Sequence, residues 1–120
     1  MRIVIQRMKA LADPARLRLV ALLIQGELCV CQLEAALNLS QTNVSRHLAV
    51  LRQGDIVTDR REGRWVYYGL KDPMETELRA IIDAVMRDMV NDPTIREDRI
   101  RADDVRCLRP DEIVAVPVQA

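Results

Sequence analysis

The chain has 120 residues, of which 49% are hydrophobic and 30% are charged, and its 18 basic and 18 acidic side chains give a formal net charge of zero. This length suits one domain and is too short for two independent cores. The longest apolar run, LVALLI, is far below a membrane span, and the N-terminus lacks the features of a signal peptide. We therefore expect a cytoplasmic protein with no membrane partner.

The charges are spread unevenly along the chain. Residues 40–71 carry six basic and three acidic side chains, whereas residues 72–120 carry seven basic and twelve acidic ones. Affinity for phosphates depends on the local field rather than on the total charge. The basic middle segment is therefore compatible with binding to DNA.

The N-terminal segment predicts two helices. The first is short, with apolar positions at Ile3, Val4, Met8 and Leu11. The second begins at Asp13 and Pro14, which are typical N-cap and first-turn residues, and its apolar positions recur at helical spacing until Gly26.

The next two helices form a predicted helix-turn-helix. One covers about residues 30–37, and Asn38 at its end tolerates the left-handed conformation that often ends a helix. The other is capped by Ser40, buries Val44, Leu48 and Leu51, and stops at Gly54.

Residues 56–70 predict a β-hairpin with a tight turn at Glu62 and Gly63. A long helix is then expected from Asp72 to the NDP sequence at 91–93, with a continuous apolar seam that suits a dimer interface: Met74, Leu78, Ile81, Ile82, Val85 and Met89. These elements predict a mainly α winged helix-turn-helix with a small β-hairpin over residues 1–92. A partly disordered C-terminal tail is expected over 93–120. A helical bundle with an incidental hairpin is the alternative fold.

The second helix of the helix-turn-helix has the composition of a DNA-reading helix. Short polar side chains and donors gather near its N-terminus, where such a helix enters the major groove. The candidates are Ser40, Gln41, Thr42, Ser45, Arg46 and His47. His47 equally suits a partly buried hydrogen-bonding position. The hairpin adds Arg60, Arg61 and Arg64, which suit a contact with the backbone or the minor groove. The alternative is that these side chains are merely solvated.

Cys29 and Cys31 precede this helix-turn-helix, and Cys107 is the only other cysteine. Soft thiolates select thiophilic ions, and arsenite or antimonite favours three sulfur ligands. In a regular helix, residues i and i+2 lie about 200° apart, so both thiols face one ion only if the segment is extended or distorted there. A helix N-terminus also lowers the pKa of a thiol. Packing in the core is the alternative role.

Four stretches of the sequence resemble the ArsR/SmtB family of metalloregulatory repressors over about residues 8–90: LADPARLRLVALL, ELCVCQL, SQTNVSRHLAVLR and DRREGRWVYYGL. ELCVC resembles the metal box of the arsenic- and cadmium/lead-responsive members. The resemblance implies a homodimeric winged helix-turn-helix repressor that binds double-stranded operator DNA when metal-free and leaves it when metal binds. It implies arsenite or antimonite as inducer, with Cys29 and Cys31 as ligands and no organic cofactor.

The third ligand departs from the family pattern. Arsenic-responsive members with this box often have a cysteine where this chain has Glu34. Either Cys107 completes the metal site, within one chain or across the dimer, or a small external thiol or hydroxide does so. Cadmium or lead is less favoured because relatives that sense those ions usually add cysteines from the N-terminal arm, and residues 1–12 have none. A zinc or nickel site on the last helix is disfavoured because that helix has no histidine.

The sequence also bears on three other classes of function. We expect no enzyme, because the sequence has no CxxC, no glycine-rich phosphate loop and no cysteine followed six positions later by arginine. A repressor that senses oxidants through the thiol pair remains an alternative. A protein-interaction module, in which the seam from Met74 to Met89 docks a foreign helix, is a further one.

Overall fold

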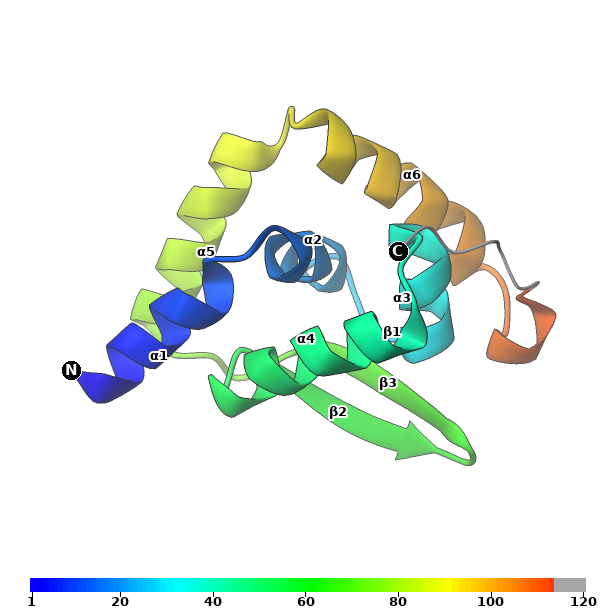
Figure 1. Cartoon of the computed structure of the whole chain (residues 1–120), viewed down its shortest axis with the longest axis horizontal. Coiled ribbons are helices and arrows are strands. Elements are labelled where there is room, and N and C mark those ends of the chain that lie inside the picture. The colour runs from blue at the N-terminus through cyan, green and yellow to red at the C-terminus, as the bar shows by residue number, and fades with distance from the viewer. Residues whose placement is uncertain (114–120) are drawn as a thin grey trace.

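The computed structural model describes residues 1–113 (Figure 1). Within that part the chain forms six α-helices, three strands and one 3-10 turn: α1 (Arg2–Leu11), α2 (Pro14–Leu23), β1 (Leu28–Cys29), α3 (Val30–Leu37), α4 (Gln41–Gln53), β2 (Val57–Glu62), β3 (Trp65–Leu70), α5 (Thr76–Met89), α6 (Pro93–Arg106) and Pro110–Glu112. Helices α3 and α4 form the helix-turn-helix, and β2 and β3 form the wing. The expected winged helix-turn-helix is therefore confirmed.

The expected helix caps are present. The carboxylate of Asp13 accepts hydrogen bonds from the backbone amides of Ala15 and Arg16, at 2.9 and 3.2 Å. Asn38 ends α3 in the left-handed conformation, with φ 56°. The hydroxyl of Ser40 accepts a hydrogen bond from the amide of Asn43 at 3.2 Å, which starts α4. These local contacts fix where the helix-turn-helix begins and turns.

The wing differs from the expected two-stranded hairpin. Strand β1 pairs antiparallel with β3, so the strand order is β1-β3-β2, and Cys29 lies opposite Tyr67. Because Glu62 pairs with Trp65, the turn consists of Gly63 and Arg64, one residue later than expected. Gly63 has φ 59°, in the left-handed region that glycine tolerates best.

Helix α5 begins at Thr76 with Glu75 as its N-cap, four residues later than Asp72, where the helix was expected to begin. The amide of Lys71 still donates to the carbonyl of Ile56 at 3.0 Å. The chain is therefore held beside the sheet until residue 71 and becomes helical only after it has turned away. As a result, Met74 precedes the helix.

The expected irregular tail is wrong for residues 93–106, which form α6. The carboxylate of Asp92 accepts hydrogen bonds from the amides of Thr94 and Ile95, at 2.9 and 3.2 Å, and Pro93 is the first helical residue. Helix α6 lies against α2 and α3 (Figure 1), and Ile95 and Ala102 are buried there. The part of the expected tail after residue 113 lies outside the described residues, and the domain boundary at residue 92 remains a prediction.

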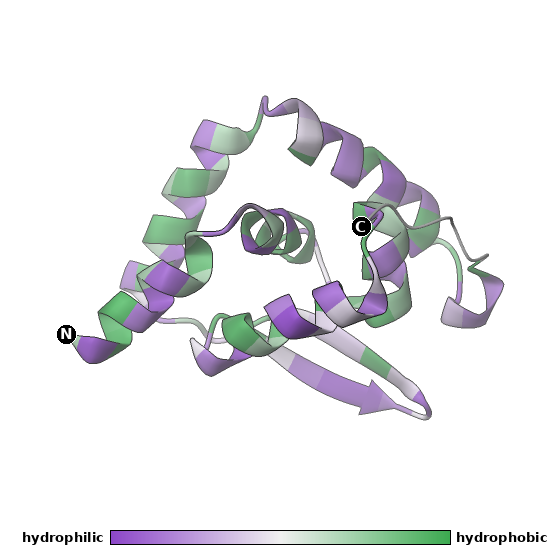
Figure 2. Ribbon diagram, in the orientation of Figure 1, coloured by the Kyte–Doolittle hydropathy of each residue, from purple (hydrophilic) through white to green (hydrophobic). Residues whose placement is uncertain are grey.

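The core is aliphatic. Its largest fully buried side chains are leucines, isoleucines and valines from α2, β1, α3, α4, α5 and α6 and from the approach to β2. Helix α2 lies at the centre of the molecule, and strand β2 is hydrophilic and exposed after its buried first residue, Val57 (Figure 2). Within residues 1–113, none of the helices has the length and apolar character needed to cross a membrane.

Candidate functional site

The thiol pair lies where the sheet ends and the helix-turn-helix begins. Cys29 is the last residue of β1 and the N-cap of α3, with extended dihedrals of φ −79° and ψ 165°, and Cys31 is the second residue of α3. This extended residue brings the two sulfur atoms within 2.7 Å of each other. The extended geometry that one shared ion would require is therefore confirmed. Two sulfurs that meet at one point suit a thiophilic ion.

The electrostatics of the pair differ from the expectation. Burial, together with the hydrogen bond to the Cys29 thiol, raises the pKa of Cys31 to about 12. Hydrogen bonds from the amides of Gln32 and Cys31 lower the pKa, but they are outweighed. The expected lowering by the helix N-terminus is thus wrong for Cys31. This thiol keeps its proton at neutral pH.

Cys107 is exposed at the C-cap of α6, and its sulfur lies 3.9 Å from the carbonyl of Asp103. Among residues 1–113, no three cysteine, histidine or acidic side chains gather closely enough to hold a metal ion. The structure therefore brings together two of the three expected ligands. Glu34 lies one turn after Cys31 on α3, half-buried, and burial raises its pKa.

Gln32 links the thiol segment to the end of α6, and the sequence interpretation missed it. Its side-chain oxygen accepts a hydrogen bond from the amide of Cys29 at 2.8 Å. Its side-chain nitrogen donates to the carbonyls of Leu108 at 3.1 Å and Val105 at 3.3 Å. The turn that carries Cys107 is therefore held one buried side chain away from Cys29. A capping-box spacing from Cys29 to Gln32 was the available signal.

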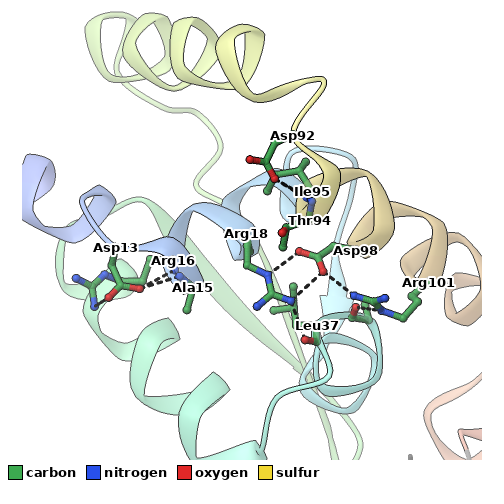
Figure 3. Close-up of polar contacts among 11 residues, drawn as sticks. Asp13, Ala15, Arg16, Arg18, Leu37, Asp92, Thr94, Ile95, Asp98 and Arg101 are labelled. Carbon is green, nitrogen blue, oxygen red and sulfur yellow. Dashed lines mark hydrogen bonds and ion pairs between the residues drawn. The ribbon is translucent and has the colours of Figure 1, made fainter. Parts of the chain in front are cut away.

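A second polar cluster joins α6 to the end of α3 (Figure 3). Asp98 of α6 is fully buried, and its carboxylate accepts two hydrogen bonds from Arg18 of α2, at 2.8 and 2.9 Å. Arg101 donates a third at 2.8 Å. The hydrogen bonds that Arg18 donates to Asp98 raise the pKa of Arg18. Arg18 also donates to the carbonyl of Leu37 and Arg101 to that of Ala36, so the cluster holds the last turn of α3.

Helix α4 presents most of the expected DNA-reading side chains to solvent. The exposed ones are Gln41, Thr42, Ser45 and Arg46. Arg46 donates to the side chain of Asn43 at 3.2 Å, which holds its guanidinium near the start of the helix. The hydroxyl of Ser40 accepts the capping hydrogen bond, so this side chain already has a structural role in starting α4.

His47 lies between α4 and α2 rather than on the open face. Its Nδ1 atom is 3.2 Å from Nη1 of Arg16 and 3.9 Å from a carboxylate oxygen of Asp13. Burial lowers the pKa of His47, partly offset by the charge of Asp13. The structure therefore favours the partly buried, hydrogen-bonding alternative for this residue.

The three wing arginines have different environments. Arg60 donates to Glu27 at 2.8 Å and Glu62 at 2.9 Å and stacks on Tyr67, so it is engaged within the protein. Arg64 stacks over Trp65 at the hairpin tip, 4.8 Å from the ring centre. Arg61 is exposed and has no ion pair within residues 1–113. Arg61 and Arg64 are consequently the available cations of the wing.

The expected dimer seam is only partly at the surface. Leu78 and Ile82 are 3% and 1% exposed because α5 uses this face to close the core of its own chain. Ile81 is exposed, while Met74, Val85 and Met89 are half-buried. On the same side of the molecule (Figure 1), α1 exposes further apolar side chains: Ile3, Val4, Ile5 and Met8. We call these exposed apolar residues of α1, together with Ile81 of α5, the α1–α5 apolar surface.

Residues 13–59 match the family described as "Bacterial regulatory protein, arsR family". The chain is 48% identical to the arsenical resistance operon repressor of Escherichia coli strain K12 over 84 residues, which cover 69% of this chain and 72% of that one. It is also 48% identical over 84 residues to the arsenic resistance transcriptional regulator ArsR1 of Pseudomonas putida, of which the match spans only 62%.

Solved structures are also similar over most of the chain. HlyU from Vibrio cholerae N16961 has a TM-score of 0.67 and 34% sequence identity, with 75% of this chain and 95% of that chain covered. The transcriptional repressor BigR from Xylella fastidiosa has a TM-score of 0.60 and 33% identity, with 70% and 83% covered. The arsenic relatives and BigR are named as regulators or repressors, which agrees with the expectation of a protein that is not an enzyme.

Proposed function

This chain belongs to the ArsR family of bacterial regulatory proteins, and from that premise we propose that it is a cytoplasmic, homodimeric repressor that releases operator DNA when arsenite or antimonite binds its thiols. The observation that carries the proposal is the contact between the sulfur atoms of Cys29 and Cys31, 2.7 Å apart at the first residues of the helix-turn-helix. The names of the arsenic-responsive relatives support the choice of ion.

The proposed inducer site uses Cys29 and Cys31 as ligands, and Cys107 of the same chain as the third. In support, Gln32 holds the carbonyls on both sides of Cys107, at Val105 and Leu108. The Cys107 sulfur is exposed at the C-cap of α6, so no packing in the core holds it in its present direction. Hydroxide or a small thiol on the third position is the alternative that a Cys107 variant distinguishes.

The proposed DNA surface combines α4 with the wing. Gln41, Thr42, Ser45 and Arg46 enter the major groove, and Arg61 and Arg64 contact the phosphate backbone or the minor groove. A two-fold operator requires two copies of this surface. We propose that the α1–α5 apolar surface pairs two chains, because it exposes a group of large aliphatic side chains: Ile3, Val4, Ile5, Met8 and Ile81.

Capture of the ion acts on DNA through the backbone at Cys29. Drawing both sulfurs around one ion changes the extended segment that leads into α3, and α4 begins at Gln41, ten residues after Cys31. A coupling free energy of about 1 to 3 kcal/mol corresponds to a roughly 5- to 150-fold loss of operator affinity. No large rearrangement of the core is required for an effect of this size.

The pH dependence of binding distinguishes arsenite from cadmium or lead. Each hydroxyl of arsenite leaves as water with the proton of a thiol, so no free proton is released. A divalent cation instead releases the Cys31 proton, which the raised pKa of about 12 retains through neutral pH. Between pH 6 and 8 we expect a flat affinity for arsenite, and an affinity for cadmium that rises by about tenfold or more per pH unit.

Isothermal titration of the free protein at three pH values, with each ion in turn, measures this dependence. The inducer is then identified by adding each ion to a complex with fluorescent operator DNA and following anisotropy. Release by cadmium or lead, with no release by arsenite or antimonite, would assign the chain to the runner-up class of repressors.

A redox-sensing repressor is the second candidate, because two adjacent thiols can be joined by an oxidant. Each thiol gives up one proton and one electron to the oxidant as the sulfur–sulfur bond forms, and peroxide is reduced to water. Treatment of the complex with peroxide, with and without subsequent reduction, separates the two functions. Release by peroxide but not by arsenite would select the redox function.

A further inference from the structure

Helix α6 spans α3 from the thiol pair to the turn before α4. At its C-terminal end, Gln32 connects the amide of Cys29 to the carbonyls of Val105 and Leu108. Nearer the start of α6, Arg101 donates to the carbonyl of Ala36. The buried Asp98 accepts from Arg18, which also donates to the carbonyl of Leu37. One continuous helix of 14 residues therefore contacts both ends of α3, and Figure 3 shows the polar contacts at the C-terminal end of α3.

We propose that α6 is the element that transmits ion capture at Cys29 and Cys31 to α4, with Gln32 and Arg101 as the positioning residues for this coupling. The inference rests on the proposed function of the thiol pair. It assigns a regulatory role to a helix that begins after residue 92, beyond the segment that resembles the family.

The first step of the coupling is at Gln32. This side chain is buried, so a hydrogen bond that it loses is not readily replaced by one to water. When the backbone of Cys29 moves, the Gln32 oxygen either follows the amide or loses its bond. The side-chain nitrogen of Gln32 holds the end of α6, so that end must also follow or lose its hydrogen bonds.

The second step is at the turn before α4. Between Asp98 and Val105 the helix is unbroken, so displacement of its C-terminal end moves Arg101 as part of the same body. The carbonyls of Ala36 and Leu37 then lose or follow their arginine donors, 2.7 and 2.8 Å away. These carbonyls directly precede Asn38, whose left-handed conformation sets the direction in which α4 leaves.

Gln32→Glu tests the first step. An ionised glutamate still accepts the hydrogen bond from Cys29 but cannot donate to Val105 or Leu108, so the link to α6 is lost. Gln25→Glu is the matched control, because Gln25 is exposed in the loop after α2 and the change in charge is the same.

Arg101→Ala tests the second step. The Arg101 side chain is 40% exposed, so the variant is expected to fold even if the Gln32 variant does not. Arg96→Ala is its control on the same helix, since Arg96 is exposed and has no polar contact within residues 1–113. For each variant, operator affinity is measured with and without saturating arsenite, together with arsenite binding to the free protein.

The wild type and both controls are expected to lose operator affinity by the same factor, within the roughly 5- to 150-fold range of typical allosteric coupling. In Gln32→Glu and Arg101→Ala that factor falls below about threefold, while arsenite still binds and metal-free operator affinity is retained. Wild-type coupling in both variants would overturn the role of α6. An operator affinity that falls equally with and without arsenite counts as wild-type coupling, because the factor lost to arsenite is then unchanged. Failure of arsenite to release the wild type would instead overturn the proposed function.

Discussion

Cys31→Ser is expected to abolish release of the operator by arsenite while leaving DNA binding by the metal-free protein intact. Cys31 is half-buried at the start of α3, and serine has nearly the same shape, so the helix and α4 keep their positions. Loss of a group that merely supports a metal ligand already costs about 10- to 100-fold in affinity, so loss of a ligand is expected to cost more than about 100-fold.

Fluorescence anisotropy of labelled operator DNA, with arsenite added to each variant, measures this effect. Cys29→Ser is expected to give the same loss of response with some loss of stability, because Cys29 is only 1% exposed. Cys107→Ser separates the alternatives for the third ligand, since an intact response would remove Cys107 from the site. Release of Cys31→Ser at wild-type arsenite concentrations would show that the ion binds elsewhere.

Asp98→Ala is expected to lower the free energy of unfolding by about 3 kcal/mol, the lower end of the range for breaking a buried ion pair. The carboxylate is fully buried and accepts three hydrogen bonds from two arginines. Removing the carboxylate leaves the guanidiniums of Arg18 and Arg101 without this charged acceptor. The Arg18 and Arg101 side chains are 20% and 40% exposed, so water partly compensates them, which is why the lower end applies.

Urea unfolding followed by circular dichroism measures this loss. Asp104→Ala is the matched control, because Asp104 is an exposed carboxylate of α6 with no polar contact within the described residues, and a change within about 0.5 kcal/mol is expected there. Equal stability of the two variants would show that the cluster contributes nothing to holding α6.

Those parts of the fold that depend on local contacts could be predicted from the sequence. Asp13, Asn38 and Ser40 act on backbone groups within a few residues, so their identities alone place the ends of α2, α3 and α4. Strand β1 could not be predicted, because two residues have no periodicity and depend on Tyr67 and Tyr68 across the sheet.

Helix α6 was missed although its start has a clear signal. Asp92 and Pro93 repeat the capping pair of Asp13 and Pro14, but the sequence interpretation used them only as the end of α5. The helix is highly charged, so no long apolar stripe marks it. It packs through arginines that donate to backbone carbonyls, including Arg101 to Ala36 and Arg106 to Leu22.

The backbone geometry of the thiol pair could be predicted from the sequence, but the surroundings of the pair could not. Helical geometry indicated that the segment at Cys29 to Cys31 must be extended or distorted if both sulfurs are to meet, and the structure shows Cys29 extended. The pKa of Cys31 depends on burial, which the local sequence does not give. Gln32 and Asp98 act on partners 73 to 80 residues away, so no local pattern identifies their roles.

Ion capture by Cys29 and Cys31 is expected to remove the protein from DNA. The most direct measurement adds arsenite to the protein–operator complex and follows operator release and the number of free thiols in the same sample. We expect release to follow the loss of free thiols at Cys29 and Cys31, ending at one arsenic per chain. An operator that stays bound after both thiols are occupied would contradict the account.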